Sequence, residues 1–340
     1  MQGVKPFVSI ALATYNGERF LAEQLESLVN QTYPKLEIIV SDDGSTDKTV
    51  SILERYAAIH PQIRIYQNTG KSGVTNNFQH AIRHCEGVFI ALADQDDIWL
   101  PGKIEQLVNG IGTASLIYHD SLLIDEAGRS LQTTAVDKGY TGNDPVVFLL
   151  KNIVSGHACL FKRELLEEAL PFPAAICHDW WLAAVAADND GIKFLPEVLV
   201  HYRQHSENAS DFLNKKSLNS SRTARELYLR DLSRFACFKS LKVNQLFFRE
   251  WWLLNRSKTG KWLCPRLFFL CIQNRKSLFQ LHNKSNFSVF LRSLGFLWGF
   301  KLKAVVDKKY RFEARQNEPG KRETLHKYPA TQGTLQGVRS

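Results

Sequence analysis

Short apolar runs alternate with helical segments along the first hundred residues of the chain. The apolar runs cover residues 8–12, 36–40, 63–66 and 88–93. Apolar residues at helical spacing fill the segments between them, at about 20–30, 47–59 and 76–85, and Pro101 marks the start of a further helix. Buried strands separated by helices predict an α/β domain with a mostly parallel, Rossmann-like sheet and helices on both faces.

Polar clusters follow three of these four predicted strands. They are Thr14-Tyr15-Asn16, Asp42-Asp43 and Asp94-Gln95-Asp96. In open parallel sheets, ligands bind beyond the carboxyl ends of the strands. We therefore expect the three clusters to meet at one rim and to form a binding site there.

The pattern is mixed from residue 115 to about 205 and becomes helical afterwards. It predicts strands near Ile117, Cys159 and Leu199 and helices near Val146 and Trp180. The predicted organisation is a catalytic domain at 1–210, a basic, aromatic-rich helical region at 211–312, and a disordered polar tail at 313–340.

Composition indicates a globular protein, and the charge is divided unevenly between the two parts of the chain. The chain has 340 residues, 44% of them hydrophobic and 23% charged, which is typical of a globular protein. Residues 211–340 hold 27 Lys+Arg and 8 Asp+Glu, whereas residues 1–210 hold 16 and 26. The basic half is therefore expected to face an anionic partner.

Scattered cysteines and the absence of a signal peptide or an apolar span predict a cytoplasmic protein.

Asp94 and Asp96 form an Asp-x-Asp pair in a turn directly after a buried strand. Two carboxylates in such a turn can hold one Mg²⁺ or Mn²⁺, and the ion can bridge the phosphates of a nucleotide donor. The motif alone is weak, because solvated acids in turns are common. Its position beside two other polar strand ends favours a metal site, and His205 is a further candidate ligand.

The other strand ends carry groups suited to a nucleotide. Asp42 can accept from the imide N–H of a uracil or thymine ring, and Thr14, Tyr15 and Asn16 are expected beside the same ring. Arg203, near the end of a later strand, can neutralise diphosphate charge. Each of these residues could also serve ordinary loop chemistry.

His178-Asp179-Trp180-Trp181 begins a predicted helix. Asp179 could be an N-cap, or it could take the proton from an acceptor hydroxyl as a general base. Trp180 and Trp181 offer flat faces for a sugar ring, although at least one of them could belong to the core.

These motifs occur in the order found in a known family. Residues 8–210 resemble the family 2 glycosyltransferases of the GT-A fold, on the basis of Ala13-Thr14-Tyr15-Asn16-Gly17, Ser41-Asp42-Asp43-Gly44-Ser45-Thr46-Asp47, Asp94-Gln95-Asp96-Asp97 and His178-Asp179. The resemblance implies an inverting, metal-dependent transfer of a sugar from a nucleotide-sugar donor. It assigns base reading to Asp42, the ribose and metal to Asp94, the metal to Asp96, and catalysis to Asp179. His178 departs from the Glu that the family often has there.

A second, more specific resemblance concerns the sugar of the donor. The segments Ser155-Gly156-His157-Ala158, His178-Asp179-Trp180-Trp181-Leu182 and Tyr202-Arg203-Gln204-His205 look like bacterial rhamnosyltransferases of O-antigen synthesis. That implies dTDP-L-rhamnose as donor and makes His157 a candidate contact for the sugar or acceptor. A UDP-hexose donor, or a nucleotide-binding module without transferase activity, remains an alternative.

The helical region leaves two interpretations open. Residues 251–300 contain 8 Lys+Arg and no Asp or Glu, interleaved with aromatic residues. This pattern fits helices on the anionic inner face of the cytoplasmic membrane, and it suits a lipid-linked saccharide acceptor. It also fits a helical subdomain with an aromatic core. No recognition motif supports nucleic-acid binding, and no GxGxxG follows the first strand, which argues against a dehydrogenase.

Overall fold

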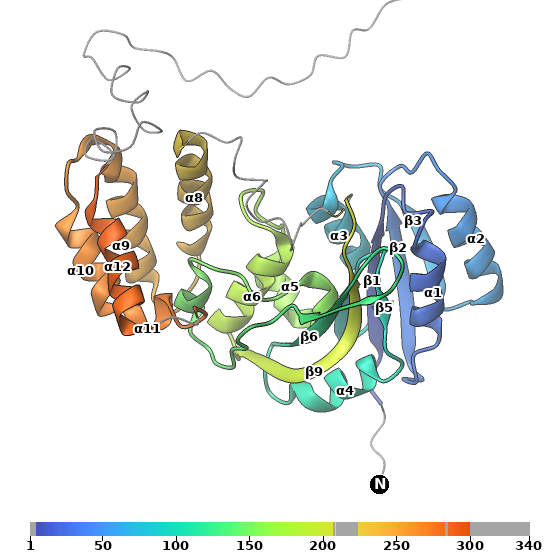
Figure 1. Ribbon diagram of the computed structural model, residues 1–340. Coiled ribbons are helices and arrows are strands. Elements are labelled where there is room, and N and C mark those ends of the chain that lie inside the picture. The colour runs from blue at the N-terminus through green and yellow to red at the C-terminus, as the bar shows by residue number, and fades with distance from the viewer. Residues whose placement is uncertain (1–4, 207, 209–223, 283–284, 300–340) are drawn as a thin grey trace, which may run out of the picture.

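A mixed sheet with helices on both faces forms one end of the molecule, and a group of helices forms the other (Figure 1). The computed structural model describes residues 5–206, 208, 224–282 and 285–299. The strands are β1 (Val8–Thr14), β2 (Leu36–Asp42), β3 (Ile63–Gln67), β4 (Phe89–Ala93), β5 (Ile98–Trp99), β6 (Leu116–Ile124), β7 (Ser130–Thr134), β8 (Cys159–Lys162) and β9 (Ile192–Arg203).

Helices follow the strands and continue beyond them. Those within the first 210 residues are α1 (Leu21–Val29), α2 (Thr49–Ile59), α3 (Val74–Arg83), α4 (Lys103–Ile111), α5 (Leu166–Ala169) and α6 (His178–Asp188), with short 3-10 turns η1 (Pro145–Phe148), η2 (Gly156–Ala158) and η3 (Arg163–Leu165). The later ones are α8 (Ala224–Phe238), α9 (Gln245–Arg256), η4 (Ser257–Gly260), α10 (Pro265–Gln273), α11 (Arg275–Leu278) and α12 (Asn286–Leu297).

The order of strands in the described sheet is β3-β2-β1-β4-β8-β6-β9-β5, and β7 pairs with β6. The first four positions are parallel, as predicted from the alternation of strands and helices. β8 then runs antiparallel between β4 and β6, while β6 and β9 are parallel to each other. The prediction of a mostly parallel α/β sheet is therefore confirmed.

Side chains of the central strands alternate between two hydrophobic cores. Ile10 and Leu12 pack with α1 and α4 on one face, and Ala11 and Ile39 pack with α3 and α6 on the other. This alternation follows from the two-residue period of a strand. It explains why the central strands read as continuous apolar runs, since helices cover both of their faces.

Most predicted elements are present, with small differences at their ends. The strands expected near Ile117, Cys159 and Leu199 are β6, β8 and β9, and the helix expected near Trp180 is α6. The segment near Val146 is a 3-10 turn rather than a full helix, with the Asp144 carboxylate accepting from the Val146 N–H at 3.0 Å. The predicted tail at 313–340 lies outside the described residues. No helix in the described part of the chain is long and apolar enough to cross a membrane.

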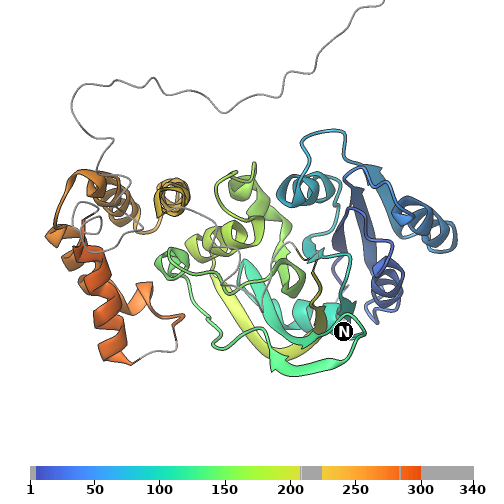
Figure 2. The same cartoon turned by 45° about the horizontal axis from the view of Figure 1, so that its top comes forward.

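The helical region packs against α6 and extends one of the two cores. The rings of Trp181 and Phe238 are 6.3 Å apart, and Phe238 and Trp251 are buried in the same cluster as α6. At the end of α6, the carboxylate of Asp188 accepts from the backbone N–H groups of Lys242 and Val243, both at 2.7 Å. Both views show α6 between the sheet and the orange helices (Figures 1 and 2).

We predict that Asp188→Ala weakens the attachment of the helical region. The substitution leaves two backbone N–H groups without their charged acceptor, so the free energy of unfolding should fall by about 1–3 kcal/mol. Urea denaturation measures this loss. Asp190→Ala is the matched control, because its side chain is 64% exposed. Equal stabilities of the two variants would contradict the anchoring role.

Candidate active site

Parallel register brings the polar strand ends together. Thr14 is level with Asp42 across β1 and β2, and Asp42 is level with Gln67 across β2 and β3. Leu12 is level with Ala93, so the turn that begins at Asp94 emerges beside the end of β1. The three polar clusters therefore meet at one rim, as the sequence predicts.

Asp42 organises the loop that follows β2. Its carboxylate accepts from the Thr14 hydroxyl at 2.9 Å and from the N–H and hydroxyl of Ser45 at 2.8 and 2.6 Å. It also accepts from the Gly44 N–H at 3.1 Å, and the residue is 3% exposed. These bonds fix the loop, and base reading by Asp42 stays a prediction.

Asn16 and Gln95 connect separate loops of the rim. Asn16 has a left-handed backbone (φ 46°), and its side-chain oxygen accepts from the Thr46 N–H at 2.8 Å. Gln95 accepts from the Tyr15 N–H at 2.9 Å and donates to the Tyr15 carbonyl at 3.0 Å. Tyr15 itself is 55% exposed, so its ring is free to meet a ligand. The sequence alone does not indicate this role of Gln95, because a Gln between two Asp residues belongs to no recognisable pattern.

Asp43 holds a second loop over the same rim. Its carboxylate accepts from the Asn68 side chain at 2.9 Å and from the Gly73 N–H at 2.7 Å. Gly73 has a φ of 109°, which suits glycine, and it precedes α3. The loop of residues 68–73 is thereby fixed beside the end of β2.

Asp94, Asp97 and His157 form a cluster below the rim. The Nδ1 atom of His157 lies 3.5 Å from a carboxylate oxygen of Asp94 and 3.5 Å from one of Asp97. Its Nε2 atom is 3.0 Å from the Ser121 hydroxyl. Asp97 and His157 are buried, while the side chain of Asp94 is 37% exposed. A buried Lys103 donates to the His157 carbonyl at 2.5 Å.

The charges of this cluster influence one another strongly. Burial raises the pKa of Asp97 to about 8, and the carboxylates of Asp96 and Asp94 add to the shift. Burial opposes protonation of His157, but Asp97 and Asp94 outweigh it and raise the pKa of the imidazole. Burial also holds the pKa of Lys103 well below its usual range. One oxygen of Asp97 has no hydrogen-bond partner within the described structure.

Asp96 points to a different partner, His205. The Nε2 atom of His205 is 2.8 Å from a carboxylate oxygen of Asp96, and the imidazole ring lies 4.9 Å from the Phe20 ring. Two of the three residues that the sequence proposes as metal ligands are therefore adjacent, one from the turn after β4 and one that follows β9.

Arg203, which the sequence predicts to contact the diphosphate, is buried and bonded within the protein. The residue is 2% exposed. Its guanidinium donates to the carbonyls of Asp96 and Glu126 at 2.9 and 3.0 Å and pairs with Glu23. Its backbone N–H donates to Asp97 at 3.1 Å. Arg203 therefore positions the turn that carries the acidic residues.

Asp179 enters the site from the first turn of α6, beside Gly156. A Cβ at Gly156 would lie 3.2 Å from His178 Nε2 and 3.9 Å from Asp179 Cβ, so a glycine permits this close approach. Burial raises the pKa of Asp179, and Asp94 is near enough to raise it further. The candidate base and the acidic turn are thus in electrostatic contact, and the role of Asp179 stays a prediction.

The two tryptophans differ in position. Trp181 is 4% exposed and donates its indole N–H to the Ala169 carbonyl at 3.1 Å, so of the two predicted alternatives for this residue the structure shows the core position. Trp180 is partly buried, and the Arg234 guanidinium of α8 lies 4.5 Å from its ring centroid. His157, the other predicted contact for sugar or acceptor, is 1% exposed, and that contact stays a prediction.

The donor atoms of the cluster below the rim include carboxylates that fit a hard divalent cation. Among the described residues, Asp94, Asp97 and His157 have ligand atoms within 4.8 Å of one another. The carboxylates suit Mn²⁺ or Mg²⁺, and the imidazole is the softer ligand of the set. The Asp97 oxygen that accepts no hydrogen bond supports such an ion, and Asp96 of the same turn forms a second candidate ligand pair with His205, which follows β9.

Comparison with known proteins agrees with the motifs. Residues 9–170 match the model of Glycosyl transferase family 2. This part of the chain is a family 2 glycosyltransferase domain. An uncharacterized glycosyltransferase of Haemophilus influenzae is 28% identical over 62% of this chain and 69% of its own length. The putative glycosyltransferase EpsE of Bacillus subtilis is 34% identical over 34% of this chain and 45% of its length, so the chain spans less than half of that relative.

Solved structures share the fold of this glycosyltransferase chain. TarS of S. aureus, in complex with UDP-GlcNAc, aligns with a TM-score of 0.55 at 16% identity, over 92% of this chain and 88% of that one. The mannosyltransferase PcManGT of Pyrobaculum calidifontis, in complex with GDP-Man and Mn²⁺, has a TM-score of 0.50 at 19% identity, over 92% and 85%. The predicted GT-A fold with a following helical region is confirmed.

We predict that Asp97→Asn removes part of the pH dependence of stability. Folded Asp97 keeps its proton up to about pH 8, whereas an unfolded Asp loses it near pH 4. The unfolded state binds fewer protons between these values, so this group makes the free energy of unfolding fall as pH rises. The variant should therefore gain stability over the wild type as pH rises from about 4 to 8.

Urea denaturation in a chelator at several pH values measures that difference. Asp190→Asn, at an exposed site, serves as the control and should follow the wild type. A constant difference between Asp97→Asn and wild type over the whole pH range would show that Asp97 titrates like an exposed carboxylate.

Proposed function

We propose that the protein transfers a sugar from a nucleoside-diphosphate donor to an acceptor hydroxyl with inversion at the anomeric carbon. The observation that carries the proposal is the position of Asp179 beside Gly156, because the next residue, His157, lies 3.5 Å from Asp94 of the acidic turn. A base and a diphosphate-binding turn on the same side of the sheet are what a single displacement requires. The family 2 domain at residues 9–170 supports the reaction class.

In the proposed reaction, Asp179 takes the proton of the acceptor hydroxyl. The acceptor oxygen forms a bond to the anomeric carbon, and the bond from that carbon to the donor diphosphate breaks, with its electron pair leaving on the diphosphate. A divalent cation, when bound, would offset the charge that develops on the leaving group. Asp94, Asp96 and His205 are the proposed ligands, because Asp96 and His205 lie 2.8 Å apart at the rim.

The nucleotide is proposed to lie across the ends of β1 and β2. Asp42, Thr14 and the exposed ring of Tyr15 face this part of the rim, and Asn16 and Gln95 hold its loops. Arg203 contributes by fixing the turn at Asp96 rather than by touching phosphate. The neighbours solved with UDP-GlcNAc and GDP-Man support a nucleotide sugar as donor.

The finer proposal is dTDP-L-rhamnose as donor and a lipid-linked oligosaccharide of bacterial surface polysaccharide as acceptor, at the inner face of the cytoplasmic membrane. It rests on the likeness of the segments around His157, Asp179 and Arg203 and on the basic helical region. A UDP-hexose donor is the alternative. Hydrolysis measured over a panel of dTDP-, UDP- and GDP-sugars with Mn²⁺ present distinguishes them, and turnover of UDP-hexose alone would overturn the rhamnose proposal.

We predict that Asp179→Asn lowers the transfer rate by about 100- to 10,000-fold while donor affinity stays nearly unchanged, because an amide cannot accept the proton. Wild-type activity should rise with pH through a raised carboxyl pKa, since Asp179 must be ionised to act. Steady-state kinetics and calorimetric donor titration measure the two effects. Asp190→Asn is the control, and near wild-type turnover of Asp179→Asn would exclude it as the base.

We also predict that a chelator abolishes activity and weakens donor binding, and that added Mn²⁺ restores both. Asp96→Asn should raise the Mn²⁺ concentration for half-maximal activity by about tenfold or more, because it removes a charged ligand. His157→Gln is the comparison, since His157 belongs to the buried cluster. A larger shift in His157→Gln than in Asp96→Asn would place the ion among Asp94, Asp97 and His157 instead, and full activity in chelator would contradict a metal-dependent reaction.

A further inference from the structure

An apolar stripe runs along the outer side of α12. Phe287, Phe290 and Leu291 are exposed, with Phe287 at 69%, and they recur at spacings of three and four residues. Such spacing places them on one side of a helix. The other side packs inward, where Ser293 is buried against Cys271 of α10. α12 therefore uses its inner side for packing and presents large apolar groups outward.

The apolar surface continues onto α10 and the strand-like segment before it. Phe268 of α10 lies 6.3 Å from Phe290 and 5.5 Å from Phe269, which is 60% exposed. At the other end of α12, Leu263 pairs with Trp298 in a β-bridge. We call this set the α10–α12 surface; its exposed members are Trp262, Leu263, Phe269, Phe287, Phe290, Leu291 and Trp298.

The charge around the α10–α12 surface is positive. The described residues between 251 and 299 include Lys261, Arg266, Arg275, Lys276 and Arg292, all exposed, and no Asp or Glu. Arg266 is 82% exposed at its side chain and also reaches Glu250 of α9 at 3.4 Å. An anionic partner would therefore meet little repulsion on this side of the molecule.

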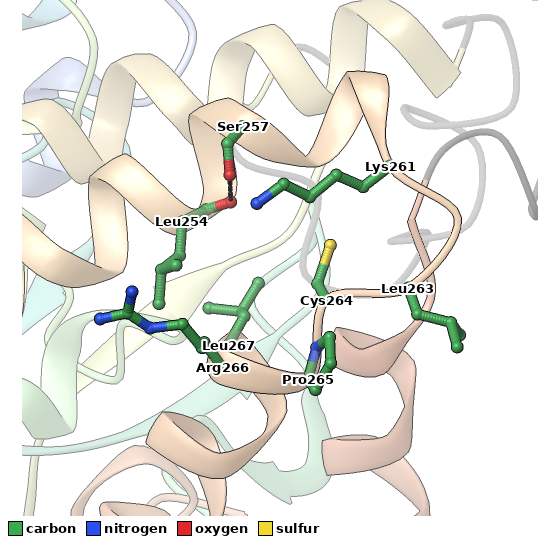
Figure 3. Close-up of a pocket in the computed structure, with 8 residues that line it drawn as sticks. All are labelled: Leu254, Ser257, Lys261, Leu263, Cys264, Pro265, Arg266 and Leu267. Atoms are coloured by element: carbon green, nitrogen blue, oxygen red, sulfur yellow. Dashed lines mark hydrogen bonds between the residues drawn. The ribbon is translucent and has the colours of Figure 1, made fainter.

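A pocket opens within this basic and apolar region (Figure 3). Its volume is about 240 Å³, and Leu254, Leu263, Pro265 and Leu267 line it together with Lys261 and Arg266. Figure 3 shows the side chains of Lys261 and Arg266 on two sides of it. Aliphatic walls with cations beside them suit an acyl chain with a phosphate headgroup.

We infer that the α10–α12 surface binds the surface of an anionic phospholipid bilayer. Aromatic side chains enter the boundary between headgroups and acyl chains, and Lys and Arg side chains meet the anionic headgroups. A protein partner would need acidic residues placed opposite each of these cations. The surface of an anionic bilayer is negatively charged throughout and meets all of them at once. This inference rests on the proposed function, since it names where the enzyme meets the membrane that carries its acceptor.

Sedimentation of the full chain with vesicles tests the inference. We expect binding to vesicles of equal parts phosphatidylcholine and phosphatidylglycerol, weak binding to phosphatidylcholine alone, and a loss of binding at high salt. The double variant Phe269→Ser, Phe287→Ser should bind anionic vesicles at least about tenfold more weakly. The matched control is Ile59→Ser with Val88→Ser, which removes exposed apolar groups from the sheet domain.

Two outcomes of the comparison with the double variant would overturn the inference. One is equal vesicle binding by the double variant and the wild type. The other is a wild-type dimer that the double variant converts to monomer without any vesicle binding, which would make this a contact between copies of the chain. Donor hydrolysis should be unchanged in the double variant. If the wild type hydrolyses donor but does not bind vesicles, the membrane inference is wrong and the proposed function stands. If it binds vesicles but hydrolyses no donor, the proposed function is wrong and the membrane inference stands.

Discussion

Parallel pairing of β1 with β2 and β4 is the constraint on which the rest of the site depends. It places residues from three separate segments, at 14, 42 and 94, within reach of one another without any direct sequence relation. The loops then need few further bonds, and Asp42, Asp43 and Gln95 supply them through side-chain contacts with backbone N–H groups. A slip in this register would separate all of these groups at once.

Buried charge is the second feature that shapes the site. Asp97, His157 and Lys103 lie in the low-dielectric interior between β4, α4 and η2, where an unpaired ion is costly. Burial raises the pKa of Asp97, and the His157 imidazole 3.5 Å away opposes that shift. A divalent cation would change that balance by favouring the ionised carboxylate, so metal binding there would release protons.

The sequence predicted the sheet well, because buried parallel strands give continuous apolar runs that polar turns interrupt clearly. It also predicted which strand ends converge. It did not separate residues that face a ligand from those that hold the turn: Arg203 and Trp181 are of the right type, but both are buried by tertiary packing. Gln95, Asp97 and Lys103 became visible only through contacts between distant segments, which no local pattern records.

The attachment of the helical region at Asp188 has a geometric consequence. α6 carries Asp179 in its first turn and Asp188 at its end, so one helix of 11 residues, about 16 Å long, joins the candidate base to the helices that bear the α10–α12 surface. With the α10–α12 surface bound to a bilayer, α6 would hold Asp179, and with it the acceptor hydroxyl, at a fixed height above the lipid. Under the proposed function, that height would set the distance from the lipid at which an acceptor hydroxyl can react.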